Sequence, residues 1–515
     1  METANLASSP PHISLPRLPA LLSQITLCEG AHDQIAVSAP FTGETLGTIP
    51  AARDSDVDLA VEHTRAAQPA WAASSFTTRA KIFLRFYDLL VQRFDEVLDL
   101  IQLETGKARA HAHEEVLDTA IVSRYYALRA EKLLRPQRRK GAFPLLTQTW
   151  KFRSPVGVIG FISPWNYPLT LSITDAIPAL MAGNTAVLKP DRQTSSTALW
   201  AVSLLREAGL PTGVLQVVTG DGSTVGPALA KRVDFLMFTG STATGKSIAT
   251  QAAARLIGCS LELGGKNPMI VCADADVESA VSGAIRGCFT AAGQLCVSIE
   301  RIYIHESIFD RFATRFADEA RKLKMGAAFD YSADLGSLTS RRQLAKVEEH
   351  VQDAVNKGAT LLTGGRRRPE LGPLFYEPTV LTEVHENMKV YTEETFGPVV
   401  SLYKFQTENE AIARANATSY GLNASVWTRN TSRGIDLARK IRAGSININE
   451  AYISAWGSVD SPIGGMKESG IGRRHGAEGI LKFTEPQTVA VQRFPLPTNR
   501  IKLASLLKLL RLFPG

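Results

Sequence analysis

The sequence contains few cysteines, and their spacing does not match any common pairing. The five cysteines lie far apart in 515 residues, with no C-x-x-C pair: Cys28, Cys259, Cys272, Cys288 and Cys296. An odd number at wide spacings excludes a disulfide framework and offers no zinc spacing, so no metal site is expected. This usage is typical of a reducing compartment, and we expect a cytoplasmic protein with at most one or two reactive thiols.

Long apolar segments are also missing. No run approaches the roughly 20 residues that span a bilayer. The first residues, METANLASSPPHISLPRLPA, lack the basic cap and apolar core of a secretory signal, and residues 1–34 are expected to form a loose tail. The contents of 44% hydrophobic and 21% charged residues are ordinary for a soluble enzyme of two or three domains.

The net charge of +7 does not indicate a nucleic-acid surface. Residues 495–515 alone carry four of these charges, and the other basic clusters are short and lack interleaved aromatic residues. Within 500–513 the leucines share one helical face and the basic residues lie opposite. This amphipathic segment is predicted to dock on a partner subunit, to lie on an anionic membrane surface or to stay disordered.

Short apolar strands alternate with helical segments from Pro155 onward. Strands are predicted at 156–162, 186–188, 214–218, 233–238 and 260–263, and again at 268–272, 301–304, 398–403, 423–427 and 445–448. Such alternation predicts βαβ units and parallel sheets covered on both faces, which is the doubly wound architecture that binds nucleotides. Two segments without helical period, 142–152 and 487–494, are predicted to form ribbon strands outside both sheets.

The stretch FTGSTATGKS allows two interpretations. Residues 240–247 fit the P-loop spacing G-x-x-x-x-G-K-[ST] after an apolar strand, and Asp274 could supply the acid that holds Mg²⁺. The same glycine-bearing loop before a helix also suits the pyrophosphate of a dinucleotide. A clean G-x-G-x-x-G is absent, because residues 220–226 miss that pattern by one position. The loop alone does not decide between an NTPase and a dinucleotide enzyme.

Several segments at predicted strand ends carry chemistry. They are PWNYP at 164–168, LKP at 188–190, LELGGKNP at 261–268, GQLC at 293–296 and EETFGP at 393–398. With FTGSTATG at 238–245, their order and spacing resemble the aldehyde dehydrogenase superfamily over roughly residues 35–495. The resemblance makes the P-loop match a coincidence. It implies an α/β fold with a Rossmann-like doubly wound cofactor domain, an α/β catalytic domain and a small β-ribbon oligomerisation element.

The resemblance also implies domain limits and an assembly. The cofactor domain would comprise 35–140 and 153–264, and the catalytic domain 265–445. The ribbon would comprise 141–152 and 486–495, followed by the amphipathic tail 496–515. Because the family assembles through its ribbon strands, a homodimer or homotetramer is expected.

The resemblance implies a role for each of three catalytic residues in this sequence. Cys296 resembles the nucleophile that forms a thiohemiacetal with the aldehyde. The amide of Asn166, with the Cys296 backbone N–H, resembles an oxyanion hole, and Glu262 resembles the base that activates water to hydrolyse the thioester. A non-catalytic relative or an esterase is the remaining alternative, and the presence of all three residues argues against it.

The cofactor site is carried over in the same way. It would comprise Lys189 at the adenosine ribose, Gly240 and Ser241 at the pyrophosphate, Glu394 at the nicotinamide ribose, and Phe396 and Trp165 beside it. Arg192 replaces a glutamate that NAD-preferring relatives often have, and an arginine pairs well with a 2′-phosphate. We therefore predict that NADP⁺ is preferred, with NAD⁺ as the alternative if Asp191 turns toward the ribose.

Two classes of aldehyde are open as the substrate. Segments around Cys296 and residues 450–476 resemble a bacterial group of NADP-dependent succinate-semialdehyde dehydrogenases, and Ser458 matches a substrate-side position of enzymes with that activity. The arginines that such enzymes place near the nucleophile and after the oxyanion-hole asparagine are Thr290 and Thr174 here. A hydrophobic aliphatic or aromatic aldehyde is the alternative, since aromatic residues are abundant nearby: Phe161, Trp165, Tyr167, Phe289, Tyr452 and Trp456.

Overall fold

Two predominantly parallel sheets organise the chain. The computed structural model describes residues 18–141, 147–494, Ala504, Ser505 and Lys508. The first sheet has the order β17-β9-β8-β5-β6-β7, with only β17 antiparallel to its neighbour. Its strands are β5 (Val158–Ile162), β6 (Thr185–Lys189), β7 (Leu215–Val217), β8 (Phe235–Thr239), β9 (Gly258–Glu262) and β17 (Gly470–Ile471). This is the predicted doubly wound sheet.

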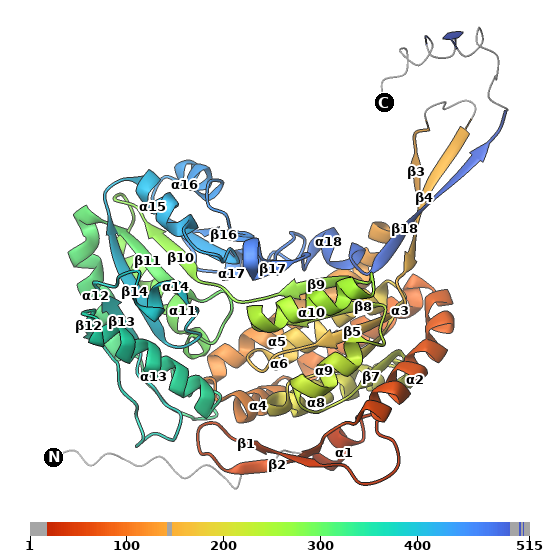
Figure 1. The fold of residues 1–515 in the computed structure, drawn as a ribbon, viewed down its shortest axis with the longest axis horizontal. Coiled ribbons are helices and arrows are strands. Elements are labelled where there is room, and N and C mark those ends of the chain that lie inside the picture. Colours follow the sequence, from red (N-terminus) through yellow and green to blue (C-terminus); the bar gives the residue numbers. More distant parts are fainter. Residues whose placement is uncertain (1–17, 142–146, 495–503, 506–507, 509–515) are drawn as a thin grey trace.

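Helices cover both faces of the first sheet (Figure 1). One layer contains α2 (Asp54–Ala73), α9 (Gly222–Ala230) and α10 (Thr242–Ala254). The opposite layer contains α3 (Phe76–Gln92), α4 (Phe94–Thr105), α5 (Arg109–Leu134), α6 (Pro168–Ile173), α7 (Ala176–Met181) and α8 (Ser195–Glu207). Strands β5 to β8 are buried at every position, which explains why they are continuous apolar runs in the sequence.

The second sheet has the order β12-β13-β14-β11-β10-β15-β16 and is parallel except for β12. Its strands are β10 (Asn267–Val271), β11 (Ile299–His305), β12 (Thr360–Thr363), β13 (Thr379–Thr382), β14 (Val399–Phe405), β15 (Asn423–Trp427) and β16 (Ser445–Ile448). Its helices are α11 (Val277–Phe289), α12 (Phe309–Lys322), α13 (Arg341–Asn356), α14 (Lys389–Thr392), α15 (Glu408–Asn416) and α16 (Thr431–Ala438). The short helices α17 (Ile453–Trp456) and α18 (Gly476–Leu481) lead back to the first sheet.

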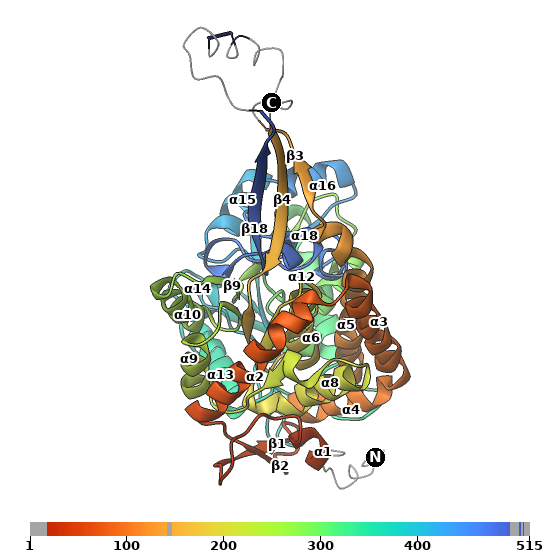
Figure 2. The ribbon, with the colours of Figure 1, turned by 90° about the vertical axis from the view of Figure 1, so that its right-hand side faces the viewer.

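A three-stranded ribbon projects from the body (Figures 1 and 2). It pairs β4 (Thr147–Pro155) with β18 (Thr484–Gln492) and β3 (Gln137–Arg139), all antiparallel. The two longer strands run in register from Thr484 opposite Pro155 to Gln492 opposite Thr147. The predicted ribbon segments are thus strands, each beginning and ending a few residues from the expected limits.

The observed secondary structure departs from a simple reading of the sequence at three places. Residues 18–34, expected as tail, are packed on the body: α1 (Leu18–Leu22) buries Leu21, Ile25 forms a bridge with Val217, and β1 (Gln34–Ser38) pairs with β2 (Thr45–Pro50). The helical segment between β5 and β6 forms two short helices, α6 and α7, rather than one. Helix α11 ends at Phe289, because Ala291 and Ala292 have φ of 51° and 54°. Within the described residues, no helix is long and apolar enough to cross a membrane.

Candidate functional site

The carboxyl ends of four neighbouring parallel strands carry predicted site residues. Asn166 follows β5, Lys189 ends β6, Gly240 follows β8 and Glu262 ends β9. In doubly wound sheets, ligands bind at this edge because the loops there diverge and leave a crevice. Residues separated by almost 100 positions are therefore brought to one side of the first sheet.

The loop that holds Cys296 is sharply bent. After α11, three successive residues have positive φ, ending with Gly293 at 69°. A Cβ on Gly293 would lie 2.0 Å from the Gly397 carbonyl oxygen, so this position requires glycine. Asn267 Nδ2 then donates to the carbonyl oxygens of Cys296, at 2.8 Å, and Ser298, at 2.7 Å. Cys296 is half-buried after this bend, whereas Cys272 and Cys288 are buried in the core around the second sheet.

Asn166 lies beside this loop. Its side-chain Nδ2 donates to the Gln294 carbonyl oxygen at 2.9 Å, and it lines the same cavity as Cys296. An asparagine amide nitrogen has two N–H groups, so a second donor remains for a ligand. The structure therefore brings together the predicted nucleophile and the predicted oxyanion donor.

A buried ion pair anchors the backbone of Asn166. Lys107 Nζ donates to the Asn166 carbonyl oxygen at 2.7 Å and to Glu115 Oε1 at 2.6 Å. Glu115 Oε2 in turn accepts from the backbone N–H of Leu169, at 2.8 Å, in the first turn of α6. Nothing in the sequence marks Lys107 and Glu115, because a lysine and a glutamate eight residues apart give no sign that they will be buried as a pair.

Glu262 is a buried carboxyl without a full set of partners. It is 7% exposed, and its Oε1 has no hydrogen-bond partner among the described residues. Burial raises the pKa of Glu262 to about 7, against the opposing attraction of Arg474 and Lys482. A carboxyl with a pKa near neutrality is suited to accept a proton from water.

The cations near Glu262 belong to a buried cluster around Asp175. Arg474 lies 2.8 Å and Lys482 3.1 Å from the Asp175 carboxylate, and all three side chains are less than a tenth exposed. Burial raises the pKa of Cys296 and of Asp118, and the charge of Arg474 partly offsets that rise. Nothing in the sequence connects Arg474 with this site, because it lies 178 positions beyond Cys296 and approaches it only through the fold.

The surroundings of Cys296 favour the protonated thiol over the thiolate. Burial raises the pKa of Cys296 to about 12, and the negative charges of Glu262 and Glu394 contribute to the increase. A positive charge brought next to the sulfur would lower this pKa and favour the thiolate. The site is therefore poised for a cationic ligand beside the thiol.

Trp165, Phe396 and Glu394 form a second group of predicted site residues. The rings of Trp165 and Phe396 meet edge to face at 5.5 Å. Glu394 accepts the Gly265 backbone N–H at 2.7 Å, and burial raises its pKa to about 7. Buried Glu300 holds this segment by accepting the backbone N–H groups of Thr395 and Phe396.

Lys189 fits a polar ligand at the end of β6. It is 3% exposed, and its ammonium forms no hydrogen bond or ion pair with any described residue. Burial lowers the pKa of Lys189, which a bound acceptor would reverse. Gly240 and Ser241 precede α10, where Ser241 caps the helix and the first N–H groups of the helix face outward. An anionic phosphate is the ligand that such a terminus favours, so these residues fit a dinucleotide.

Arg192 is occupied by an ion pair. Its Nη1 lies 2.9 Å from Asp221 Oδ2, at the start of α9, and both side chains are about half exposed. The Asp191 carboxylate is held by its own loop, because its Oδ1 accepts the Gln193 backbone N–H at 2.9 Å. Arg192 is thus held near the Lys189 end of the crevice, and a 2′-phosphate would have to compete with Asp221 for it.

The structure contradicts the P-loop interpretation. Lys246 Nζ lies 2.7 Å from Glu468 on the surface. Asp274, the candidate magnesium ligand, follows β10 in the second sheet and accepts the Thr428 hydroxyl at 2.9 Å. The lysine and the acid of a P-loop site lie at adjacent strands of one sheet, whereas here they belong to different sheets. Within the described residues, no cluster of acidic, histidine or cysteine side chains could hold a metal.

A cavity of about 100 Å³ leads to Cys296. It is lined by apolar and aromatic side chains, including Tyr167, Tyr452 and Trp456, and by the acids Glu114 and Asp118. Phe161 and Phe289, expected in this funnel, are instead buried in the two cores, where Phe289 stacks on Phe316 at 5.8 Å. Ser458 is exposed and donates to the Ser454 carbonyl oxygen.

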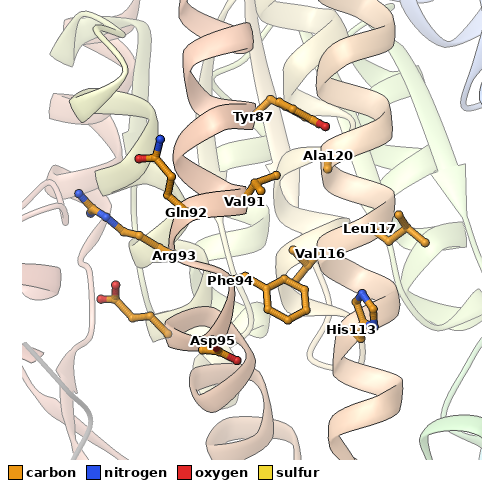
Figure 3. Close-up of a pocket in the computed structure, with 11 residues that line it drawn as sticks. Tyr87, Val91, Gln92, Arg93, Phe94, Asp95, His113, Val116, Leu117 and Ala120 are labelled. Carbon is orange, nitrogen blue, oxygen red and sulfur yellow. The ribbon is translucent and has the colours of Figure 1, made fainter.

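A wider hollow of about 690 Å³ lies on another side of α5 (Figure 3). Its floor is apolar, with Phe94, Val116 and Ala120 between the α3–α4 corner and α5. None of its lining residues is a predicted site residue, and it shares only Leu117 with the cavity at Cys296. Its position separates it from the chemistry at the strand ends.

Comparisons with known proteins agree with this geometry. A Mycolicibacterium smegmatis protein named "Putative succinate-semialdehyde dehydrogenase (NADP⁺)" is 51% identical over 88% of both chains. An NADP-dependent enzyme of E. coli superposes with a TM-score of 0.87 at 36% identity, over 92% of this chain and 99% of that one. Betaine aldehyde dehydrogenase of Staphylococcus aureus, solved with NAD⁺, gives 0.89 at 32% identity, over 95% and 99%. The aldehyde dehydrogenase family pattern matches residues 27–489, and the chain belongs to this family of oxidoreductases that act on aldehydes.

Proposed function

We propose that this protein oxidises an aldehyde to the carboxylic acid through a covalent bond to Cys296, with NADP⁺ preferred over NAD⁺ as hydride acceptor. The observation that carries the proposal is that Cys296 and Asn166 line one cavity. The buried Glu262 carboxyl is close enough for its charge to raise the pKa of the Cys296 thiol. This is the nucleophile, donor and base set that an acyl-enzyme mechanism needs.

In the first step the Cys296 thiol gives its proton to water and its sulfur attacks the aldehyde carbon to give a thiohemiacetal. The free N–H of Asn166 and the backbone N–H of Cys296 stabilise the oxygen that becomes negative. Bound NADP⁺ would supply the hydride acceptor for this carbon and a positive charge that favours the thiolate. Glu262 then takes a proton from the water that attacks the thioester, which releases the acid and restores the thiol.

The cofactor would be held along the carboxyl edge of the first sheet. Lys189 supplies an unpaired ammonium for the ribose, and Gly240 and Ser241 lie at the helix terminus for the pyrophosphate. Glu394 would take the second ribose, with Trp165 and Phe396 beside the ring. Arg192 would pair with the 2′-phosphate, and the NADP⁺ in the names of the mycobacterial relatives supports this preference.

The assembly is proposed from the ribbon. Phe152, Val489 and Val491 are between 36% and 47% exposed on a sheet that projects from the body, and a second copy would cover them in a homodimer or homotetramer.

A cytoplasmic location is proposed from the cysteine usage. Peripheral membrane contact through 500–513 concerns a segment that, apart from Ala504, Ser505 and Lys508, lies outside the described residues.

The deciding experiment measures aldehyde-dependent NADPH formation by the purified protein with butanal. Cys296→Ala should abolish it, whereas Cys28→Ala, a half-buried cysteine far from the site in the sequence, should retain it. The activity should be indifferent to ATP and Mg²⁺. NADPH formation that survives in Cys296→Ala would refute the proposed nucleophile.

A further inference from the structure

The cavity at Cys296 contains two acids and no cation. Its lining includes Glu114 and Asp118, four residues apart on α5, and no lysine, arginine or histidine. Side chains at this spacing share one face of a helix, so both acids belong to the wall that α5 presents to the cavity. The names of the mycobacterial relatives imply an aldehyde that carries a carboxylate, and such a substrate would meet like charges here.

The buried cations around the cavity are already neutralised. Lys107 pairs with Glu115 at 2.6 Å, and Arg474 pairs with Asp175 at 2.8 Å. Each lies behind an aromatic lining residue: Lys107 is 3.7 Å from the Tyr167 ring centroid, and Arg474 is 5.5 Å from that of Trp456. They therefore stand outside the cavity and cannot reach a substrate carboxylate without abandoning their partners.

The two acids, in contrast, have no ion-pair partner among the described residues. Glu114 accepts the hydroxyl groups of Tyr452, at 2.9 Å, and Tyr167, at 3.1 Å. Asp118 is 7% exposed, and its Oδ2 has no hydrogen-bond partner in the described part of the chain. Burial raises the pKa of both carboxyls, to about 7 for Asp118. A buried carboxylate without an ion-pair partner is costly, since the charge of Arg474 only partly offsets the burial of Asp118, and a cation in the cavity would reduce that cost.

We propose that the substrate is an aldehyde with a positively charged group, an ω-amino or quaternary ammonium aldehyde, whose cation lies against Asp118 and Glu114. The aromatic rings of Tyr452 and Trp456 add a surface that attracts such a group. The inference rests on the proposed function, because it names the substrate class of the same site.

The test compares three aldehydes with the same four-carbon backbone: 4-trimethylammoniobutanal, butanal and succinic semialdehyde. We expect kcat/KM, measured as NADPH formation, to fall in that order, with at least about a tenfold difference between the cationic and the anionic aldehyde. Asp118→Asn and Glu114→Gln should each reduce the ratio of kcat/KM for the cationic over the neutral aldehyde by about tenfold. Glu131→Gln, an exposed acid on the same helix, should leave that ratio unchanged.

Two results would count against the inference. If succinic semialdehyde is oxidised best, or if neither Asp118→Asn nor Glu114→Gln changes the ratio, the acids do not select the substrate, although butanal oxidation would leave the proposed function standing. If no aldehyde yields NADPH, the proposed function itself fails. Thermal unfolding of each variant shows whether it is folded. If Asp118→Asn does not fold, the ratio measured with Glu114→Gln is the test of the inference.

Discussion

The Asn166 amide is the residue on which the first chemical step depends most directly. Replacing it with alanine removes a donor aimed at the developing negative oxygen, and such a donor contributes about 3 kcal/mol to lowering the barrier. Asn166→Ala should therefore lower kcat/KM for butanal by about 10²- to 10³-fold. Asn387→Ala, an exposed asparagine outside the cavity, should be silent. A loss below about threefold in Asn166→Ala would remove this amide from the mechanism.

Glu262 should act after hydride transfer. In Glu262→Gln the thioester forms but hydrolyses slowly, so a single burst of NADPH, about one per active subunit, should precede a steady rate reduced by at least about 10²-fold. Rapid-mixing measurements distinguish the two phases. A variant that loses the burst as completely as the steady rate would place Glu262 in an earlier step.

The pH dependence follows from the same carboxyl. Because burial raises the pKa of Glu262 to about 7, the group is mostly protonated at pH 6 and mostly ionised at pH 8. Only the ionised form accepts a proton, so the hydrolysis rate should rise through pH 7 and then level off. Single-turnover thioester hydrolysis in Glu262→Gln should lack this rise; if the rise persists in the variant, another group is titrating.

At the scale of elements, the Lys107–Glu115 pair joins α5 to the start of α6 and to the Asn166 peptide. Lys107→Met would leave Glu115 buried without its cation, which costs roughly 3–5 kcal/mol of folding free energy. We expect a lower midpoint in denaturant unfolding together with a lower kcat/KM, since Asn166 loses its backbone anchor. Lys132→Met, on the exposed end of the same helix, should change neither.

Cofactor choice is also decided between elements, because Arg192 follows β6 and Asp221 follows β7. Asp221→Asn should release Arg192 for the 2′-phosphate and raise the ratio of kcat/KM with NADP⁺ over NAD⁺ by about tenfold. Arg192→Glu should invert the preference, since a carboxylate repels the phosphate and accepts a ribose hydroxyl. If both variants keep the wild-type ratio, the phosphate is recognised elsewhere.

At the scale of the whole molecule, the ribbon is expected to hold subunits together. Val489 and Val491 lie on one face of β18, opposite Trp150 and Gln148 of β4. Val489→Asp with Val491→Asp should convert the assembly to monomers in size-exclusion chromatography with light scattering, because buried carboxylates at an interface are not tolerated. Thr488→Asp, on the other face of the same strand, is the matched control.

Much of this molecule was readable from its sequence. The parallel strands were predicted because burial on both faces demands continuous apolar runs, as in β5 and β8. Cys296, Asn166 and Glu262 were proposed because each lies in a short motif, beside a predicted strand, that resembles a motif of the family. The left-handed bend at Ala291 and Ala292 could not be predicted, because alanine is not a residue type that favours positive φ.

The sequence by itself determined the buried parallel strands at the centre of both sheets, the family and the residues proposed for the reaction, since these follow from local patterns and motifs. It did not show β12, β13 or β17. Only the tertiary structure decided which charges meet. It paired Lys107 with Glu115, Arg474 with Asp175 and Arg192 with Asp221, and it left Glu114 and Asp118 without a cation. The reason is physical: burial and pairing depend on contacts between residues far apart in the chain, and the substrate cavity is shaped by those contacts.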